Sequence, residues 1–349
     1  MNKLTRRTVL AAPLLATQSK AAPDFHNSTI GHGDFRYRVD LKWSQADPAK
    51  NPVNDCHEMV QVSDGRLFLL TNQPLNNILI YSVAGKLLET WTVNFRGAHG
   101  LTLHKEASGK EFLYLTDTGT GRVIKTTLTG EIVLELPHAQ KCGAYPATDT
   151  YSPTETTVAP NGDIFVADGY GSQYILRFDQ TGKYLSKFGG KSTQPTNPAR
   201  FMQAHGVTLD TRGPEPLLLV TERIRNEFQW FTLDGQPRKS VYLPGAYVSR
   251  PVIAGRNLYS GVCFGMFQHD FRMWQNRGFV TILDEKDRVV SNPGGQAPAY
   301  TSDGHLQIML QDQPVFRNCH DVCVDTQGDL YVCQWASGKV YPYKLHRIG

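Results

Sequence analysis

The apolar and polar positions of the chain form a repeated unit, which is clearest at residues 318–332. There His320 stands at the start of an apolar run, a turn at Gly328 follows, and a second apolar run begins at Leu330. The same arrangement recurs at residues 56–70, 98–115, 153–166 and 204–220. Short apolar runs bounded by Asn, Asp and Gly are typical of paired strands. The chain therefore contains five clear copies of one strand–turn–strand unit.

Each clear unit except the last continues with a further hairpin. These hairpins lie at residues 78–93, 122–136, 174–188 and 227–243. Four short antiparallel strands in a unit of roughly 40 to 55 residues indicate a β-propeller blade. A degraded unit follows at residues 250–283, then an insertion at 294–314, and the last unit ends one strand short.

The missing strand has a candidate near the N-terminus. Residues 35–43 alternate apolar and polar positions without a hairpin partner beside them, which is the period of a half-buried strand. We therefore predict an all-β fold, a single six-bladed β-propeller over residues 23–349, whose ring is closed by this N-terminal strand. Such closure removes an exposed sheet edge. The alternative, a pair of open β-sandwich sheets, does not explain the repeated register.

The first residues predict export. Arg6 and Arg7 precede a short, weakly apolar run at residues 9–16, and small residues near Ala22 offer a cleavage site. This is the order of a twin-arginine signal peptide, so we expect residues 1–22 to be removed and the mature protein to be periplasmic or secreted. The alternative is a cytoplasmic N-terminus with an incidental arginine pair. The run is much shorter than the ~20 residues that span a bilayer, so no membrane span is expected.

Charge and cysteine content narrow the partners. The formal net charge is +4, and removal of residues 1–22 takes away four basic residues and no acidic one, which brings it to zero. Nucleic-acid binding requires a basic excess, so we expect no nucleic-acid partner and instead a small-molecule or peptide partner. We also expect a monomer. Six cysteines are few for 349 residues. Cys56 and Cys319 each precede a histidine of the repeated register, and either a disulfide or two buried thiols fits them.

Four of the five clear units place a histidine in one register. These are His57, His99, His205 and His320. The innermost strand of each blade lines the channel of a propeller, so these side chains should converge on its axis. Three neutral imidazoles with an open fourth position form the ligand set of a catalytic Zn²⁺ site. We therefore predict zinc, with the fourth histidine as a ligand, a group that orients a ligand, or a substrate contact; the alternative is hydrogen-bonded structural histidines.

The repeated units and their histidines resemble a known family. The units resemble NHL repeats, and several segments between residues 53 and 345 resemble peptidyl-α-hydroxyglycine α-amidating lyase, a zinc enzyme that splits a C-terminal α-hydroxyglycine into a peptide amide and glyoxylate. The resemblance implies that His99, His205 and His320 are the zinc ligands.

The same resemblance implies a calcium site and catalytic residues. Asp321 and the carbonyl of Leu101 match its structural calcium site, and oxygen atoms are the ligands that Ca²⁺ prefers. Tyr170 matches its catalytic tyrosine, Arg223 matches an active-site arginine, and Arg256 lies in a matching fifth-blade segment that we assign to substrate binding. Other interpretations stay open: Tyr170 as an ordinary rim residue, Arg223 as an ion-pair partner between blades, and Asp321 as a cap of its strand.

The chain departs from the family pattern near the predicted substrate. Asn72 stands where the family has a second catalytic arginine, and Gly171 stands where it has a disulfide-forming cysteine. His57 is an additional group in the channel register. We assign Asn72 and His57 to substrate binding. Arginines near strand starts that can replace the missing one are Arg96, Arg250 and Arg317.

The leading hypothesis is an exported zinc-dependent carbon–nitrogen lyase that acts on a carbinolamide-like substrate at the channel mouth. Tyr170 would move a proton and Arg223 would hold a carboxylate. The second hypothesis is a non-catalytic metal-containing NHL propeller that binds a peptide, glycan or protein, because this fold hosts many functions. A third is a hydrolase of the lactonase type, whose calcium is held mainly by carboxylates and Asn; the histidine ring argues against it.

Overall fold

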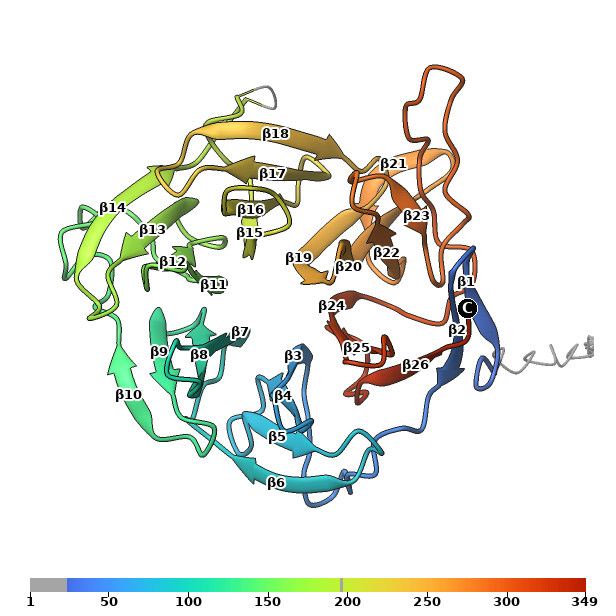
Figure 1. The fold of residues 1–349 in the computed structure, drawn as a ribbon, viewed down its shortest axis with the longest axis horizontal. Helices are drawn as coiled ribbons and strands as arrows, with labels where there is room; N and C mark the ends of the chain where they lie inside the picture. Colours follow the sequence, from blue (N-terminus) through green and yellow to red (C-terminus); the bar gives the residue numbers. More distant parts are fainter. Residues whose placement is uncertain (1–23, 195–196) are drawn as a thin grey trace, which may run out of the picture.

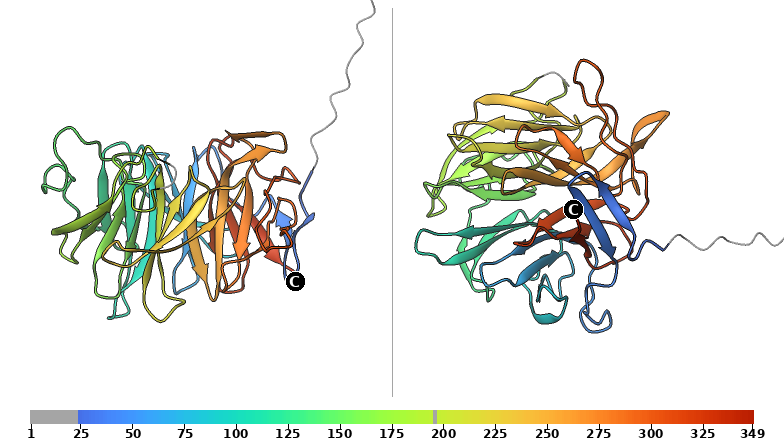
Figure 2. Two further views of the ribbon diagram at one scale, coloured as in Figure 1. Left: turned by 90° about the horizontal axis from the view of Figure 1, so that it is seen from above. Right: turned by 45° about the vertical axis from the view of Figure 1, so that its right-hand side comes forward.

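The computed structural model describes residues 24–194 and 197–349. The signal peptide predicted for residues 1–22 lies outside these ranges. The described residues form 26 β-strands and no helix, so this part of the chain has no helix able to cross a membrane. Figure 1 shows the strands grouped into sheets around one central axis, and Figure 2 shows the assembly from two further sides.

Six sheets form the ring, and each is named here as a blade, with its strands given from the centre outward. Blade 1 contains β3 (Cys56–Gln61), β4 (Leu67–Thr71), β5 (Ile78–Tyr81) and β6 (Leu87–Trp91). Blade 2 contains β7 (Ala98–Lys105), β8 (Glu111–Asp117), β9 (Arg122–Thr126) and β10 (Ile132–Glu135). Blade 3 contains β11 (Glu155–Val158), β12 (Ile164–Ala167), β13 (Tyr174–Phe178) and β14 (Tyr184–Gly189).

The other three blades complete the ring. Blade 4 contains β15 (Ala204–Asp210), β16 (Leu217–Glu222), β17 (Glu227–Phe231) and β18 (Pro237–Tyr242). Blade 5 contains β19 (Tyr247–Ala254), β20 (Asn257–Phe267), β22 (Phe279–Leu283) and β23 (Val289–Ser291), with β21 (Asp270–Trp274) paired to β20. Blade 6 contains β24 (Cys319–Val324), β25 (Leu330–Gln334) and β26 (Tyr343–Arg347), followed by the N-terminal β2 (Phe35–Asp40) and β1 (Thr29–His32). The predicted all-β, six-bladed propeller is confirmed.

Blade 6 combines the two ends of the described chain. Strand β2 pairs antiparallel with β26, with Val39 opposite Leu345, and β1 pairs with β2 outside it. Figure 1 shows this pair beside the C-terminus. Residues 24–33, which are polar in the sequence, thus contain a strand that the apolar pattern does not predict, because its partner β2 supplies the pairing.

The core lies between adjacent blades. Each inner strand contacts the inner strands of its two neighbours, including β24 with β3, so the ring is continuous. One buried cluster joins Phe68 and Leu70 of blade 1 to Leu113 and Leu115 of blade 2, and the other clusters join neighbouring blades in the same way. Burial of these apolar faces stabilises the packing of each blade against the next.

The cysteines are free thiols. Cys56 packs among residues between blades 1 and 6, with Cys323 and Cys333, whereas Cys319 packs on the other face of blade 6. The two cysteines that precede register histidines therefore do not face each other, and of the two alternatives the structure contains buried thiols.

Candidate metal centre and substrate site

The four register histidines lie in bulges at the starts of inner strands. The pairing of β3 with β4 skips His57, that of β15 with β16 skips His205, and that of β24 with β25 skips His320. His99 lies in a similar irregularity between β7 and β8. A bulge leaves a residue outside the ladder and turns its side chain, so these four side chains point to the channel axis instead of into a blade.

The four imidazole rings form one buried group. His99 and His320 stand in the middle, with ring centroids 4.7 Å apart. His57 lies 4.9 Å from His99 and 4.6 Å from His320, and His205 lies 4.8 Å and 5.2 Å from the same two rings. All four side chains are at most 5% exposed. The predicted convergence of the histidines is confirmed.

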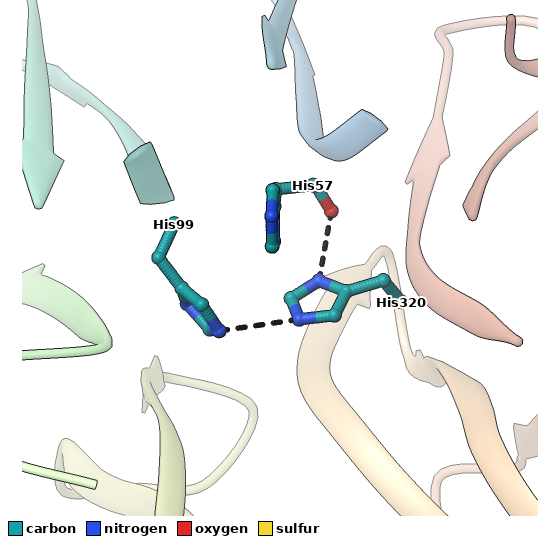
Figure 3. A group of neighbouring side chains, drawn as sticks. All are labelled: His57, His99 and His320. Atoms are coloured by element: carbon teal, nitrogen blue, oxygen red, sulfur yellow. Dashed lines mark hydrogen bonds between the residues drawn. The ribbon is translucent and has the colours of Figure 1, made fainter. Parts of the chain in front are cut away.

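Hydrogen bonds orient the two central rings. His99 Nδ1 lies 2.9 Å from the carbonyl of Thr154, and His320 Nδ1 lies 3.0 Å from the carbonyl of His57 (Figure 3). A carbonyl only accepts, so each Nδ1 donates its proton and each Nε2 of a neutral ring carries a lone pair. Burial, the largest cause, lowers the pKa of both His99 and His320 well below the usual range of histidine. Both rings are therefore neutral.

The two Nε2 atoms of these rings lie 3.2 Å apart. Two neutral imidazoles in these tautomers have no proton to share between their Nε2 atoms, and the contact becomes favourable when both lone pairs bind one cation. Tetrahedral zinc with Zn–N distances of about 2.0–2.1 Å places two ligand nitrogens about 3.3 Å apart. The donors, tautomers and spacing therefore fit zinc.

Two histidines, His57 and His205, are candidates for the third zinc ligand. Ring nitrogens of His57, His99 and His320 all lie within 4.8 Å of one another, and within residues 24–194 and 197–349 this is the one group with metal-ligand spacing (Figure 3). The resemblance instead selects His205 beside the two central histidines. The Nδ1 atoms of both His57 and His205 are buried without a hydrogen-bond partner. His99 and His320 belong to both sets.

Tyr170 lies directly at this centre. Its hydroxyl is 3.2 Å from His99 Nε2 and 3.1 Å from His205 Nε2. Burial raises the pKa of Tyr170, and the charge of Arg223 opposes this shift. The residue as a whole is 42% exposed, although its hydroxyl contacts two buried histidines.

The turn that carries Tyr170 is built around Asp168. Its carboxylate accepts hydrogen bonds from the Tyr145 hydroxyl at 2.7 Å and from the amides of Ser152 and Ser172, each at 2.6 Å. Burial raises the pKa of Asp168 to about 6. A Cβ atom at Gly171 would lie 2.1 Å from the Asp168 carboxylate. The turn therefore requires glycine where the resembled family has cysteine.

Arg223 follows β16 and is 2% exposed. It donates from Nε to the carbonyl of Val248 at 3.1 Å and from Nη2 to the Ser249 hydroxyl at 2.9 Å. In the described part of the chain no carboxylate lies within ion-pair distance of Arg223. Its guanidinium thus joins blades 4 and 5 through neutral partners. Its charge is not neutralised by these partners, which is compatible with the predicted binding of a substrate carboxylate.

Asn72 is held by a neighbouring carboxylate. Its Nδ2 donates to Asp55 Oδ2 at 3.0 Å, and its Oδ1 accepts from the Asp55 amide at 2.9 Å. Asp55 Oδ1 also accepts from the amide of Ala336. Asn72, which stands where the resembled family has an arginine, therefore holds the Asp55 side chain that contacts blade 6, and both of its own polar atoms are engaged.

The structure does not bring Arg256 to the histidines. It lies in the turn between β19 and β20, at the opposite end of the inner strand from the site, and pairs with Glu285. Its assignment to substrate binding at the histidine centre is therefore wrong, because strand β19 separates the two ends of the channel. Arg96 and Arg317 are exposed in the segments before β7 and β24, so both stay candidates for the missing arginine.

The predicted calcium ligands lie together, one layer below the histidines. The carbonyl of Leu101 and the carboxylate of Asp321 both accept hydrogen bonds from the guanidinium of Arg250. Glu58 and Glu155 are buried beside it. Sequence reasoning named Leu101 and Asp321 but missed Glu58 and Glu155. A signal for Glu58 is present in the sequence, because Glu58 directly follows His57 just as Asp321 directly follows His320.

No family model matches the chain. A segment of 139 residues is 32% identical to the probable peptidyl-alpha-hydroxyglycine alpha-amidating lyase pgal-1 of Caenorhabditis elegans, covering 39% of this chain and 38% of that protein. Peptidyl-alpha-hydroxyglycine alpha-amidating lyase 1 of Drosophila melanogaster is 27% identical over 289 residues, which cover 76% of this chain and 47% of that protein. The human NHL repeat-containing protein 3 is 26% identical over 210 residues, 57% of each chain.

These matches span less than two thirds of each relative. Among solved structures, a streptogramin B lyase superposes with a TM-score of 0.52 at 15% identity, covering 89% of this chain and 97% of the other. The virginiamycin B lyase of Staphylococcus aureus gives 0.52 at 16% identity, with 90% and 88% covered. At this identity the structures support the fold alone. The resemblance to NHL propellers and amidating lyases is confirmed, and two of the three sequence relatives described above are named as lyases.

Proposed function

We propose that the chain is an exported, zinc-dependent carbon–nitrogen lyase that cleaves a carbinolamide-like substrate at the histidine end of the channel. The observation that carries this proposal is the position of the Tyr170 hydroxyl between His99 Nε2 and His205 Nε2, beside the 3.2 Å approach of His99 and His320. A proton carrier in contact with candidate metal ligands is what a lyase of this class needs.

His99 and His320, with His205 or His57 as the third ligand, would hold the metal. A zinc ion there supplies a Lewis acid that lowers the pKa of a hydroxyl group or water bound to it. The Nδ1 donors of His99 and His320 keep the lone pairs of Nε2 directed at this position.

The protein groups can complete the reaction without another reactant. The substrate hydroxyl loses its proton, its carbon–oxygen bond becomes a carbonyl, and the carbon–nitrogen bond breaks with the electron pair leaving on nitrogen. The Tyr170 hydroxyl donates its proton to the departing amide nitrogen, and the phenol oxygen takes the proton of the substrate hydroxyl in its place. Arg223, which is buried and has no carboxylate partner among residues 24–194 and 197–349, binds the carboxylate of the substrate. The products are an amide and an oxo acid.

A second function, a metal-containing propeller that binds a peptide, glycan or protein without turnover, is favoured by one observation. Asn72 occupies the place of the family arginine and is locked onto Asp55, so it supplies no positive charge. We therefore expect turnover of a peptidyl-α-hydroxyglycine to be weak unless Arg96 or Arg317 substitutes.

The test is release of glyoxylate from a peptidyl-α-hydroxyglycine by zinc-loaded protein. Wild type should be weakly active, Tyr170→Phe should lose the activity, and Asn72→Arg should raise it because the new guanidinium would restore an anion contact beside Asp55. The matched control is Tyr242→Phe, whose side chain is 57% exposed on the outer strand of blade 4 and which should behave as wild type. Zinc-loaded protein that releases no glyoxylate in any variant would favour the binding function.

A further inference from the structure

Arg250 occupies the axis of the propeller one layer below the histidines. It is 7% exposed, although it carries a full charge. Its Nε and Nη2 atoms donate to the two oxygens of Asp321 at 3.0 and 2.8 Å, which is the bidentate geometry of a strong arginine–carboxylate pair. Blade 5 thus reaches blade 6 through the centre of the ring.

The same guanidinium contacts the other blades. Nη1 donates to the Leu101 carbonyl of blade 2 at 2.7 Å and lies 3.2 Å from Glu58 of blade 1. Nη2 reaches the Met59 carbonyl at 3.4 Å, and Nε lies 3.8 Å from Glu155 of blade 3. Two carbonyls and three carboxylates from four inner strands therefore surround one cationic group.

Blade 4 contacts Arg250 through a glycine, which allows a close approach of the two backbones. A Cβ atom at Gly206 would lie 2.9 Å from the Cα atom of Arg250, so the glycine that follows His205 lets the backbone of blade 5 approach. Glycine there has a packing reason. All six inner strands thus meet at or against Arg250.

Calcium does not fit these residues as they stand. Ca²⁺ takes 6–8 oxygen ligands at about 2.3–2.6 Å, and the two oxygen groups that the family resemblance assigns to it, the Leu101 carbonyl and Asp321, both accept hydrogen bonds from Arg250. A divalent cation bound to the same oxygens would stand against the guanidinium, and the two like charges would repel. The calcium prediction and the geometry of Arg250 exclude each other.

We propose that the Arg250 guanidinium takes the place of the calcium ion, so that this propeller carries its own cation at the axis and does not need calcium for stability. The arginine also closes the channel. On its other side the inner strands border a cavity of about 360 Å³, lined by Arg250 together with Thr102, Thr156 and Thr208. The histidine centre therefore opens to one face of the propeller.

The first measurement uses the purified wild-type protein with zinc present. Elemental analysis should find no stoichiometric calcium after purification in calcium-containing buffer, and the thermal midpoint should be the same with and without added calcium. One bound calcium per chain, or a midpoint that rises with calcium, would overturn the proposal. Chelators are avoided because they also remove zinc.

The second measurement uses Arg250→Ala. Removing the guanidinium leaves carboxylates and carbonyls facing an open space, so the midpoint should fall and added calcium should restore part of the loss, with binding of one calcium per chain by titration calorimetry. Arg250→Lys keeps one charge but reaches fewer of these oxygens and should lie between Arg250→Ala and wild type without calcium.

The matched control is Arg225→Ala. Arg225 is also buried and donates to the carbonyls of Asn197 and Gln194. Among the residues that the structure describes, one carboxylate, that of Glu222, lies within ion-pair distance of it. Its loss should lower the midpoint with no calcium response. A folded Arg250→Ala protein that ignores calcium would contradict the proposal, and if this variant fails to fold, the wild-type calcium measurements decide.

Discussion

At the scale of single residues, the tautomers of two histidines determine what the centre can bind. His99 and His320 each commit Nδ1 to a carbonyl, and their Nε2 lone pairs then meet at 3.2 Å. The strand register in the sequence is sufficient to predict that the histidines converge. It does not predict the carbonyl partners, because Thr154 and the His57 backbone belong to other blades and reach the rings only when the ring of sheets closes.

Replacement of each histidine by alanine should identify the zinc ligands. Purified protein should hold about one zinc per chain. His99→Ala and His320→Ala should release it, and we expect His205→Ala to do the same, because His205 Nε2 and His99 Nε2 face one point, the Tyr170 hydroxyl. His57→Ala should weaken binding less, since the His57 carbonyl that orients His320 is retained. Elemental analysis of the dialysed variants measures the zinc content.

His305→Ala serves as the control and should keep full zinc occupancy, because the His305 side chain is 81% exposed and pairs with Asp303. Release of zinc by His57→Ala together with retention by His205→Ala would show that the group of His57, His99 and His320 is the ligand set. Equal retention in all four variants would remove the metal assignment altogether.

At the scale of the strand, bulges and strand pairing determine the positions of residues whose identity alone is evident from the sequence. The apolar pattern predicts the inner and middle strands because their residues are buried on both faces, as in β4 and β5. It fails at β1 and β21, whose side chains are mostly exposed or partly exposed. Strands of this kind exist because a neighbour offers a free edge, and nothing in their own composition requires it.

The closing strand β2 offers a direct test of pairing and burial. Val39→Ala removes two methyl groups from a fully buried position opposite Leu345, which should cost about 2 kcal/mol of unfolding free energy. The matched control is Val133→Ala in β10, the outer strand of blade 2, where the side chain is 45% exposed and the expected change is about 0.5 kcal/mol or less. Denaturant unfolding measures both, and equal changes would mean that β2 does not contribute to the core of blade 6.

At the scale of the whole molecule, the propeller explains why residues distant in sequence act together. His57 and His320 stand near opposite ends of the chain, yet blades 1 and 6 are neighbours in the ring. The sequence repeat is sufficient to predict this closure. The role of Arg250 could not be predicted in the same way, because the contacts of this arginine are oxygens that four other inner strands bring together only when the ring of blades closes.

The last prediction concerns the route by which the folded molecule reaches its compartment. The described propeller begins after residue 23 and its first strand, β1, begins at Thr29, so cleavage near Ala22 would leave every blade complete. Export should depend on Arg6 and Arg7, because the twin-arginine signal is read by a receptor and lysine does not reproduce the planar donor geometry of arginine. Cell fractionation should find wild type outside the cytoplasm, with a mature mass that begins near Ala22, and should find the double variant Arg6→Lys, Arg7→Lys inside with its N-terminus retained. Lys20→Gln, which changes a basic residue of the same segment outside the pair, should be exported normally. A double variant that reaches the same compartment as wild type would contradict the twin-arginine route.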